Sequence, residues 1–294
     1  MKVKAWIEAM RLRTLPVSVA GVISGIACGI GNGVFKIAPA VICLLFAVLA
    51  QIVSNFANEY FDYKNGFDKK GREGFRRGVT EGDITPDAMK RATFGLLAVD
   101  CLLGLALIIW GGWWLIAIGV AVALFAIGYS AGPYPLSHHG LGDVAVVIFF
   151  GIVPVMLTSY LTCGNWGNWQ ISFGVGMAVG LMASNVLIVN NYRDMEDDSE
   201  VGKHTTVVLF GRRAMWGIYG LNFSLALIII CISLLESGAS FLWIIGWGLI
   251  EIFYIFVWIS MKKSRGKSLN RILKKTAQLV LLTSIIILVA MSTK

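Results

Sequence analysis

The chain has 294 residues, of which 57% are hydrophobic and only 14% are charged, and its formal net charge is +8. Soluble domains carry about 25% charged residues, so this composition excludes an ordinary soluble protein and indicates that lipid covers most of the surface. The six prolines and the five scattered cysteines also exclude a disordered chain, a collagen-like chain and a disulfide scaffold.

An amphipathic segment and nine apolar segments follow one another along the chain. Residues 1–14 combine basic and apolar side chains and are predicted to form a short interfacial helix. One crossing of the hydrocarbon core needs about 20 mostly apolar residues. The segments that meet this requirement are residues 15–35, 38–61, 92–110, 113–131, 142–162, 170–190, 214–235, 240–261 and 272–291. We therefore predict an all-α fold, a polytopic membrane bundle of nine transmembrane helices that forms one domain over residues 1–294.

The basic residues indicate how these segments are oriented. Of the 25 Lys and Arg residues, 23 fall on one side of the nine-segment arrangement, and only Lys36 and Lys294 fall on the other. Cytoplasmic loops of membrane proteins are enriched in Lys and Arg, so we predict a multi-pass protein of the cell (inner) membrane with a cytoplasmic N-terminus. Topology alone accounts for the positive net charge, and no nucleic-acid partner is predicted.

Nine of the 17 acidic residues lie in two short stretches, residues 59–73 and 194–200, at the predicted cytoplasmic ends of the second and sixth segments. In each stretch a triplet of Asn and Asp residues shares one helical face, because its members are three and four positions apart. The triplets are Asn55, Asn58 and Asp62, and Asn191, Asp194 and Asp198. Their offset of four segments predicts a parallel four-helix internal repeat, with the ninth helix left over.

The composition of these two stretches predicts a site for a diphosphate and a divalent cation. Crowded carboxylates at a membrane edge repel one another, and a cation removes that repulsion. Asp and Asn oxygens suit Mg²⁺, which takes one or two carboxylates and leaves its other positions to water and substrate phosphates. Basic residues follow each stretch, among them Arg72, Arg77 and Lys203. We therefore predict that residues 62–91 and 191–213 form cytoplasmic active-site loops.

These motifs resemble the two aspartate-rich motifs of the UbiA superfamily of membrane prenyltransferases. Asn58-x3-Asp62-x5-Asp68 is similar to the first motif, and the run from Asn190 to Lys203 is similar to the second. Within the superfamily the chain is most similar to the 1,4-dihydroxy-2-naphthoate polyprenyltransferases. The segments that carry this likeness are residues 13–16 (RTLP), 78–86 (GVTEGDITP), 132–136 (GPYPL) and 139–143 (HGLGD). The chain departs from the family pattern at Glu59, where the family usually has Asp, and at residues 204–206, where it usually has a basic residue followed by Thr and Leu.

The resemblance implies Mg²⁺-dependent transfer of a polyprenyl group from polyprenyl diphosphate to 1,4-dihydroxy-2-naphthoate. The ring carboxylate would be lost, giving demethylmenaquinone in menaquinone biosynthesis. It also implies that the bilayer surrounds the enzyme and that an apolar tunnel between helices holds the prenyl tail. The implied metal ligands are Asn58, Asp62, Asp68, Asp194 and Asp198. The implied catalytic residues are the four aspartates of this set and Lys203. The implied diphosphate-binding residues are Arg13, Arg72, Arg77 and Lys203, and those for the acceptor are Asn55, Asn191, Tyr129, Tyr134 and Asp143.

Other functions remain open at this point. A related enzyme could use 4-hydroxybenzoate, homogentisate or a glycerol-phosphate ether as acceptor, and only the secondary motifs argue against these. A transporter usually places its polar residues near the bilayer midplane, whereas here they gather at one face. His138 and His139 lie in a predicted loop without a visible carboxylate partner and receive no role. Asp100 and Glu251 lie inside apolar segments, and no mechanism is assigned to them.

Overall fold

A computed structural model describes residues 3–33, 35–71 and 74–293 of the chain, and this part is all-helical without a strand. The helices in chain order are α1 (Val3–Ala9), α2 (Leu15–Gly31), α3 (Ile37–Lys64), α4 (Pro86–Ala106), α5 (Ile108–Gly111), α6 (Leu115–Gly128), α7 (Gly142–Val146), α8 (Val153–Cys163), α9 (Trp169–Glu200), α10 (Thr206–Glu236), α11 (Phe241–Lys263) and α12 (Leu269–Ser292). Two short 3₁₀ turns, η1 (Leu136–His138) and η3 (Gly266–Ser268), and one π-helical turn, η2 (Val147–Ile152), complete the set.

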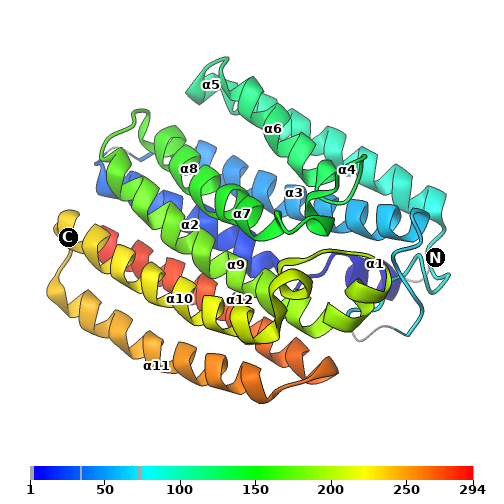
Figure 1. The fold of residues 1–294 in the computed structure, drawn as a ribbon. Helices are drawn as coiled ribbons and strands as arrows, with labels where there is room; N and C mark the ends of the chain where they lie inside the picture. Colours follow the sequence, from blue (N-terminus) through cyan, green and yellow to red (C-terminus); the bar gives the residue numbers. More distant parts are fainter. Residues whose placement is uncertain (1–2, 34, 72–73, 294) are drawn as a thin grey trace.

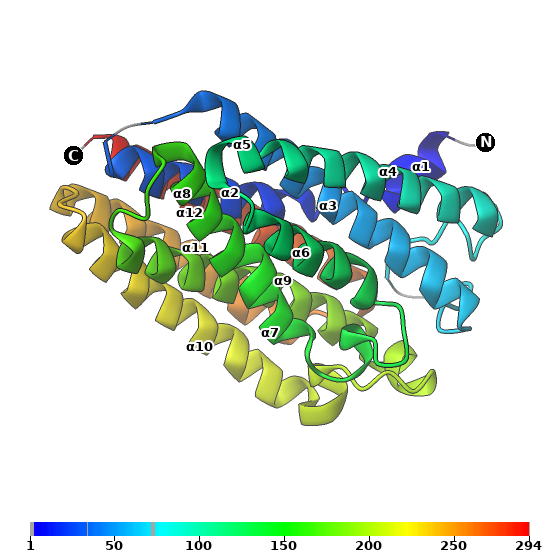
Figure 2. The same ribbon diagram turned by 90° about the horizontal axis from the view of Figure 1, so that it is seen from above.

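The predicted membrane helix bundle is confirmed as a fold class. Within the described residues, seven helical segments are long and apolar enough to cross a bilayer. Two further apolar helices are shorter, namely α2 with 17 residues and α6 with 14. Each of these nine segments overlaps one predicted span, so the count of nine crossings stays a prediction that rests on the two shorter helices. Figures 1 and 2 show the long helices running side by side, with α1 and the end of α12 at opposite ends of the bundle.

Helix α9 is the central element, and its burial explains why its second half can carry polar groups inside the protein. It packs against α2, η2, α8, α10 and α12. Small residues allow the closest of these approaches: a Cβ atom added at Gly180 would lie 2.5 Å from the carbonyl oxygen of Val147. Such contact requires glycine, and it fixes α9 against the segment that precedes α8.

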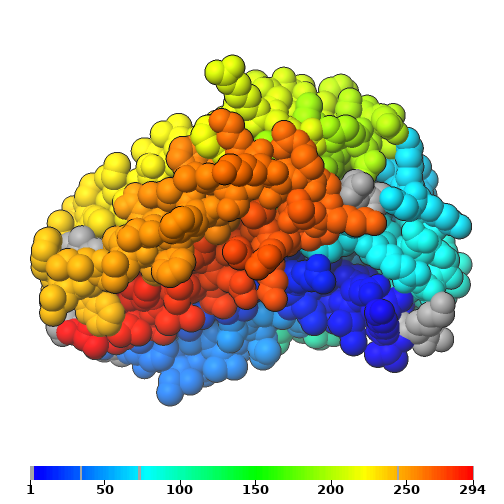
Figure 3. Space-filling view, turned by 90° about the horizontal axis from the view of Figure 1, so that it is seen from below, coloured from blue at the N-terminus to red at the C-terminus, as the bar shows by residue number. Residues whose placement is uncertain are grey.

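The order of neighbours agrees with the predicted four-helix repeat. In the first half α3 packs against α2 and α4, and in the second half α9 packs against α8 and α10. Helix α12 follows as the additional helix and packs against both α2 and α9. Figure 3 shows α11 and α12, in orange to red, beside the N-terminal segments in blue.

Several element boundaries differ from the predicted ones, and among them α4 begins at Pro86 and α10 at Thr206, inside the predicted loops 62–91 and 191–213. The interfacial helix ends at Ala9, because Arg11 adopts a left-handed backbone conformation with φ of 51°. This helix packs on the bundle, with the Trp6 ring 5.4 Å from the Phe56 ring. Helix α3 continues to Lys64 and α9 to Glu200, so residues 191–200 are helical and the loop before α10 is short. Burial of Asp194 and Asp198 inside the bundle accompanies this extension of α9.

Candidate functional site

The two aspartate-rich stretches line one pocket at the α1 end of the bundle. Helices α3 and α9 both end there (Figure 1), so the polar last turns of the two helices face the same space. The space between the lining residues amounts to about 1050 Å³, with open solvent at the mouth included. The residues of the two triplets that line it are Asn55, Asn58, Asp62, Asn191, Asp194 and Asp198. The structure thus brings together side chains that are four predicted spans apart in the chain.

Asp62 is the most enclosed acid of the pocket, with no exposed surface. Its Oδ2 accepts hydrogen bonds from Lys203 Nζ at 2.8 Å and from Asn58 Nδ2 at 3.3 Å. The Asn58 amide also donates to Ser130 Oγ at 2.9 Å, and its oxygen accepts from Arg11 Nη2 at 2.5 Å. A buried carboxylate needs such partners, because an unpaired charge loses its hydration without compensation.

Asp194 is held by its sequence neighbour. Arg193 donates from Nε to Oδ1 and from Nη2 to Oδ2 of Asp194, both at 2.7 Å. The same guanidinium donates to Asn190 on α9 and to Asn270 on α12, and it lies 5.0 Å from the centre of the Phe75 ring. Helix α12, which lies outside the repeat, therefore contributes to the ordering of the second motif.

The segment after α3 folds back over the pocket. Arg77 lines the pocket and lies 3.4 Å from Asp68, measured from Nε to Oδ2. Asp68 itself is not part of the lining but is a buried partner of a lining cation. Glu59 accepts a hydrogen bond from the backbone amide of Val79 at 3.0 Å, which ties this segment to α3. Arg72, which the sequence assigns to the diphosphate, lies outside the described residues.

The residues expected to bind the acceptor divide into two groups. Asn55, Asn191 and Tyr129 line the pocket. Tyr134 is outside the lining, 58% exposed, with its ring stacked on that of His139 at 3.6 Å. Asp143 is also outside the lining, and its oxygens accept hydrogen bonds from Ser184 at 3.0 Å and from Thr206 at 2.5 Å.

Three ionisable residues at or beside the site, Arg11, Arg193 and His138, were not selected from the sequence. Arg11 lines the pocket, whereas Arg13 lies outside the lining with its guanidinium 5.4 Å from the centre of the Phe75 ring. Arg193 could have been found from its place between Asn190 and Asp194. His138 is buried, and its Nε2 lies 3.5 Å from Asp62 Oδ1. No local signal marks His138, because its partner is far away in the chain.

The side chains of the pocket fit a hard divalent cation. Asp62, Asp194 and Asp198 bring three buried carboxylates to the wall of this one pocket. Among the residues that the structure describes, no three His, Cys, Asp or Glu side chains are close enough to enclose a metal by themselves. That arrangement suits Mg²⁺, which takes one or two carboxylates and completes its shell with water and phosphate oxygens.

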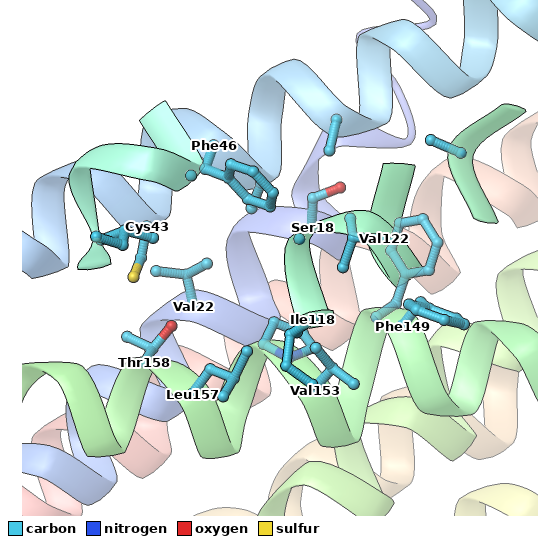
Figure 4. Close-up of a pocket in the computed structure, with 18 of the residues that line it drawn as sticks. Ser18, Val22, Cys43, Phe46, Ile118, Val122, Phe149, Val153, Leu157 and Thr158 are labelled. Atoms are coloured by element: carbon cyan, nitrogen blue, oxygen red, sulfur yellow. The ribbon is translucent and has the colours of Figure 1, made fainter. Parts of the chain in front are cut away.

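A second, apolar cavity adjoins the polar pocket, and Figure 4 shows its lining. It has a volume of about 960 Å³, open space included, and shares Gln51, Ser54, Phe125 and Phe150 with the polar pocket. Its walls come from α2, α3, α4, α6, η2 and α8, and they include Val22, Phe46, Ile118, Val122 and Leu157. On α3 the lining extends from Ser54 to Cys43, about 16 Å along the helix axis. The shape fits a long apolar chain whose polar end reaches the aspartates.

Comparisons with known proteins agree with this geometry. The family model described as the UbiA prenyltransferase family matches residues 18–284. The chain is 38% identical over 216 residues to a 1,4-dihydroxy-2-naphthoate octaprenyltransferase of Escherichia coli (strain K12), covering 71% of this chain and 70% of that protein. It is 32% identical to the enzyme of the same name from Haemophilus influenzae, covering 97% of this chain and 94% of that protein. A solved structure of a UbiA homolog from Archaeoglobus fulgidus bound to GPP and Mg²⁺ has a TM-score of 0.68 at 16% identity, covering 98% of this chain and 99% of that one.

Proposed function

The chain belongs to the UbiA prenyltransferase family, and from this premise we propose that it transfers a polyprenyl group from polyprenyl diphosphate to 1,4-dihydroxy-2-naphthoate. The observation that carries the proposal is that both aspartate-rich motifs line one polar pocket, which continues into an apolar cavity. Relatives that bear the name 1,4-dihydroxy-2-naphthoate octaprenyltransferase support this acceptor. The product would be the quinol form of demethylmenaquinone, in menaquinone biosynthesis.

We assign the polar pocket to Mg²⁺ and the diphosphate. Asn58, Asp62, Asp194 and Asp198 would hold the cation, which supplies charge neutralisation for the diphosphate oxygens. Arg77 and Lys203 line the same pocket and would stabilise the negative charge that grows on the leaving group as the allylic C–O bond breaks. Asp68 would act through Arg77, its ion-pair partner. Arg11, which the sequence did not suggest, takes the place near the diphosphate that Arg13 was expected to fill.

The apolar cavity and the polar groups around it would serve the second half of the reaction. The ring carbon that bears the carboxylate bonds to the allylic carbon, and the carboxylate leaves as CO₂ while its bonding electrons return to the ring. The apolar walls exclude water, which would otherwise capture the allylic cation. Asn55, Asn191 and Tyr129 line the pocket and offer hydrogen bonds to the acceptor.

The experiment that tests this function identifies the product. Purified protein is offered Mg²⁺, a polyprenyl diphosphate and, one at a time, 1,4-dihydroxy-2-naphthoate, 4-hydroxybenzoate, homogentisate or a glycerol-phosphate ether. We expect a prenylated product only from the naphthoate, with a mass that shows the loss of CO₂, and no product in the presence of EDTA. Efficient prenylation of another acceptor would replace the proposed acceptor, and the absence of any transfer would contradict the enzymatic function.

The apolar cavity makes a further prediction about the prenyl tail. Gly119 lies in its wall, and a Cβ atom added there would meet nothing within 4 Å. We therefore expect Gly119→Phe to place its ring in the cavity and to lower kcat/KM about tenfold or more for a long polyprenyl diphosphate. Geranyl diphosphate, which has only two isoprene units, should be less affected. Gly128→Phe is the matched control, because Gly128 lies on the same helix with open space at its Cβ but outside the cavity. Equal losses for long and short donors would contradict the assignment of the cavity to the tail.

We also propose that the end of the bundle that carries the site faces the cytoplasm in the cell membrane. Of the 25 Lys and Arg residues, 23 fall on the predicted cytoplasmic side and two on the opposite side, which supports this orientation. A cysteine introduced at Lys267 should then resist a membrane-impermeant thiol reagent added to intact cells, whereas one introduced at Glu236 should react. The reverse pattern of labelling would overturn the orientation.

A further inference from the structure

Three loops that are distant in the chain meet at Asp62. The loop after α3 contributes Phe67, the turn η1 between α6 and α7 contributes His138, and the loop after α9 contributes Lys203. The His138 ring packs edge-on against the Phe67 ring with centroids 4.4 Å apart, and Lys203 Nζ lies 5.6 Å from the centre of the same ring. His138 and Lys203 both contact the buried carboxylate of Asp62, and the Phe67 ring packs against both of them.

The two oxygens of Asp62 have different surroundings. Oδ2 accepts from Lys203 and Asn58, whereas Oδ1 accepts no hydrogen bond within the described residues. His138 Nε2 is the polar atom that faces Oδ1, at 3.5 Å, and it too is buried without a hydrogen-bond partner there. An approach of a few tenths of an ångström would bring this pair within the range of about 2.7–3.2 Å typical of hydrogen bonds from nitrogen.

The backbone holds His138 in place for this contact. Its amide donates to the carbonyl of Pro135 at 3.0 Å, and its own carbonyl accepts from the amide of His204 at 3.0 Å. The second bond links η1 to the loop that carries Lys203. His138 is only 5% exposed and is not part of the pocket lining, whereas Asp62 is. The imidazole therefore contacts Asp62 from a buried position outside the pocket lining.

We propose that His138 is a positioning residue that holds Asp62 Oδ1, so that Oδ2 is the oxygen presented to the divalent cation. The inference rests on the proposed function, because it takes Asp62 as a ligand of that cation. With Oδ1 held by His138, the carboxylate keeps its orientation when Lys203 turns from Oδ2 to the diphosphate. Partners behind a metal ligand commonly change metal affinity 10- to 100-fold when they are removed.

Two amide substitutions at His138 test whether a polar side chain is sufficient or whether its nitrogen must also reach Asp62. In His138→Gln the side-chain amide nitrogen stands at the position of Nε2 and faces Asp62, whereas in His138→Asn it stands at the position of Nδ1 and falls short. His139→Asn is the matched control, because His139 is the next residue, has its Nδ1 2.8 Å from the Pro135 carbonyl oxygen and stacks on Tyr134. For each protein in detergent, without substrates, the Mg²⁺ concentration that gives half of the maximal rise in Tm is measured. Turnover is measured against Mg²⁺ in parallel.

We expect His138→Asn to require about tenfold more Mg²⁺ in both measurements, and His138→Gln and His139→Asn to stay within about threefold of the wild type. KM for the naphthoate should not change. A general disturbance of the fold would change this KM as well, so the measurement separates the two explanations. A wild-type requirement for Mg²⁺ in His138→Asn would overturn this inference alone, as would a defect of equal size in His138→Gln. A wild-type protein that responds to Mg²⁺ in neither measurement would overturn the proposed metal site and this inference with it.

Discussion

Replacing Asp194 by Asn is expected to lower kcat about a thousandfold, which corresponds to about 4 kcal/mol of lost transition-state stabilisation. The substitution removes a charged ligand from the pocket in which the diphosphate leaves. The protein should still fold, because Arg193 keeps its bonds to Asn190 and Asn270 and its contact with Phe75. Asp198→Asn should behave in the same way, since Asp198 is buried and lines the same pocket.

Asp197→Asn provides the matched control for this prediction. Asp197 is adjacent to Asp198 on α9 but does not line the pocket. Turnover with Mg²⁺ and the Tm in detergent should be measured for all three variants. Near-normal turnover in Asp194→Asn and Asp198→Asn would rule out the metal assignment, and a loss of equal size in Asp197→Asn would show that charge alone, rather than position, matters.

Replacing Lys203 by Met should affect both stability and turnover. Lys203 Nζ is the cation nearest to the fully buried Asp62, at 2.8 Å. Removing one partner of a buried ion pair usually costs about 3–5 kcal/mol, because the remaining charge is left without compensation. We therefore expect a clear fall in the Tm measured without Mg²⁺. Turnover should fall about a hundredfold, because the leaving group also loses a positive charge.

The double variant Asp62→Asn/Lys203→Met distinguishes the two effects. With both charges removed, no buried carboxylate remains unpaired, so the Tm should return most of the way to that of the wild type. Turnover should stay at the level of Asp62→Asn or below, since both the proposed metal ligand and the cation are absent. A single variant Lys203→Met as stable as the wild type would show that the ion pair contributes little to the fold.

The sequence by itself determined the environment, the fold class and the main polar residues of the site. Hydropathy and length identify membrane helices because each crossing must satisfy its own backbone hydrogen bonds, and this is a local property. The spacing of Asn55, Asn58 and Asp62 places them on one helical face, because the face that a residue occupies depends only on its position along its own helix. The resemblance to a known family then suggested that the two motifs act together, and the structure places them in one pocket.

Only the tertiary structure decided which side chains that are distant in the chain pair with one another at and around that pocket. Arg11 and Asn58 are 47 residues apart, Arg193 and Asn270 are 77 apart, and Lys203 and Asp62 are 141 apart. It also placed Tyr134 and Asp143 outside the lining, although they match family segments, and it placed His138 against Asp62. Helical periodicity reports which face a side chain shares with its neighbours in sequence, but not which distant helix or loop covers that face. Such contacts follow from the packing of α3, α9 and α12 and from the loops that fold over their ends.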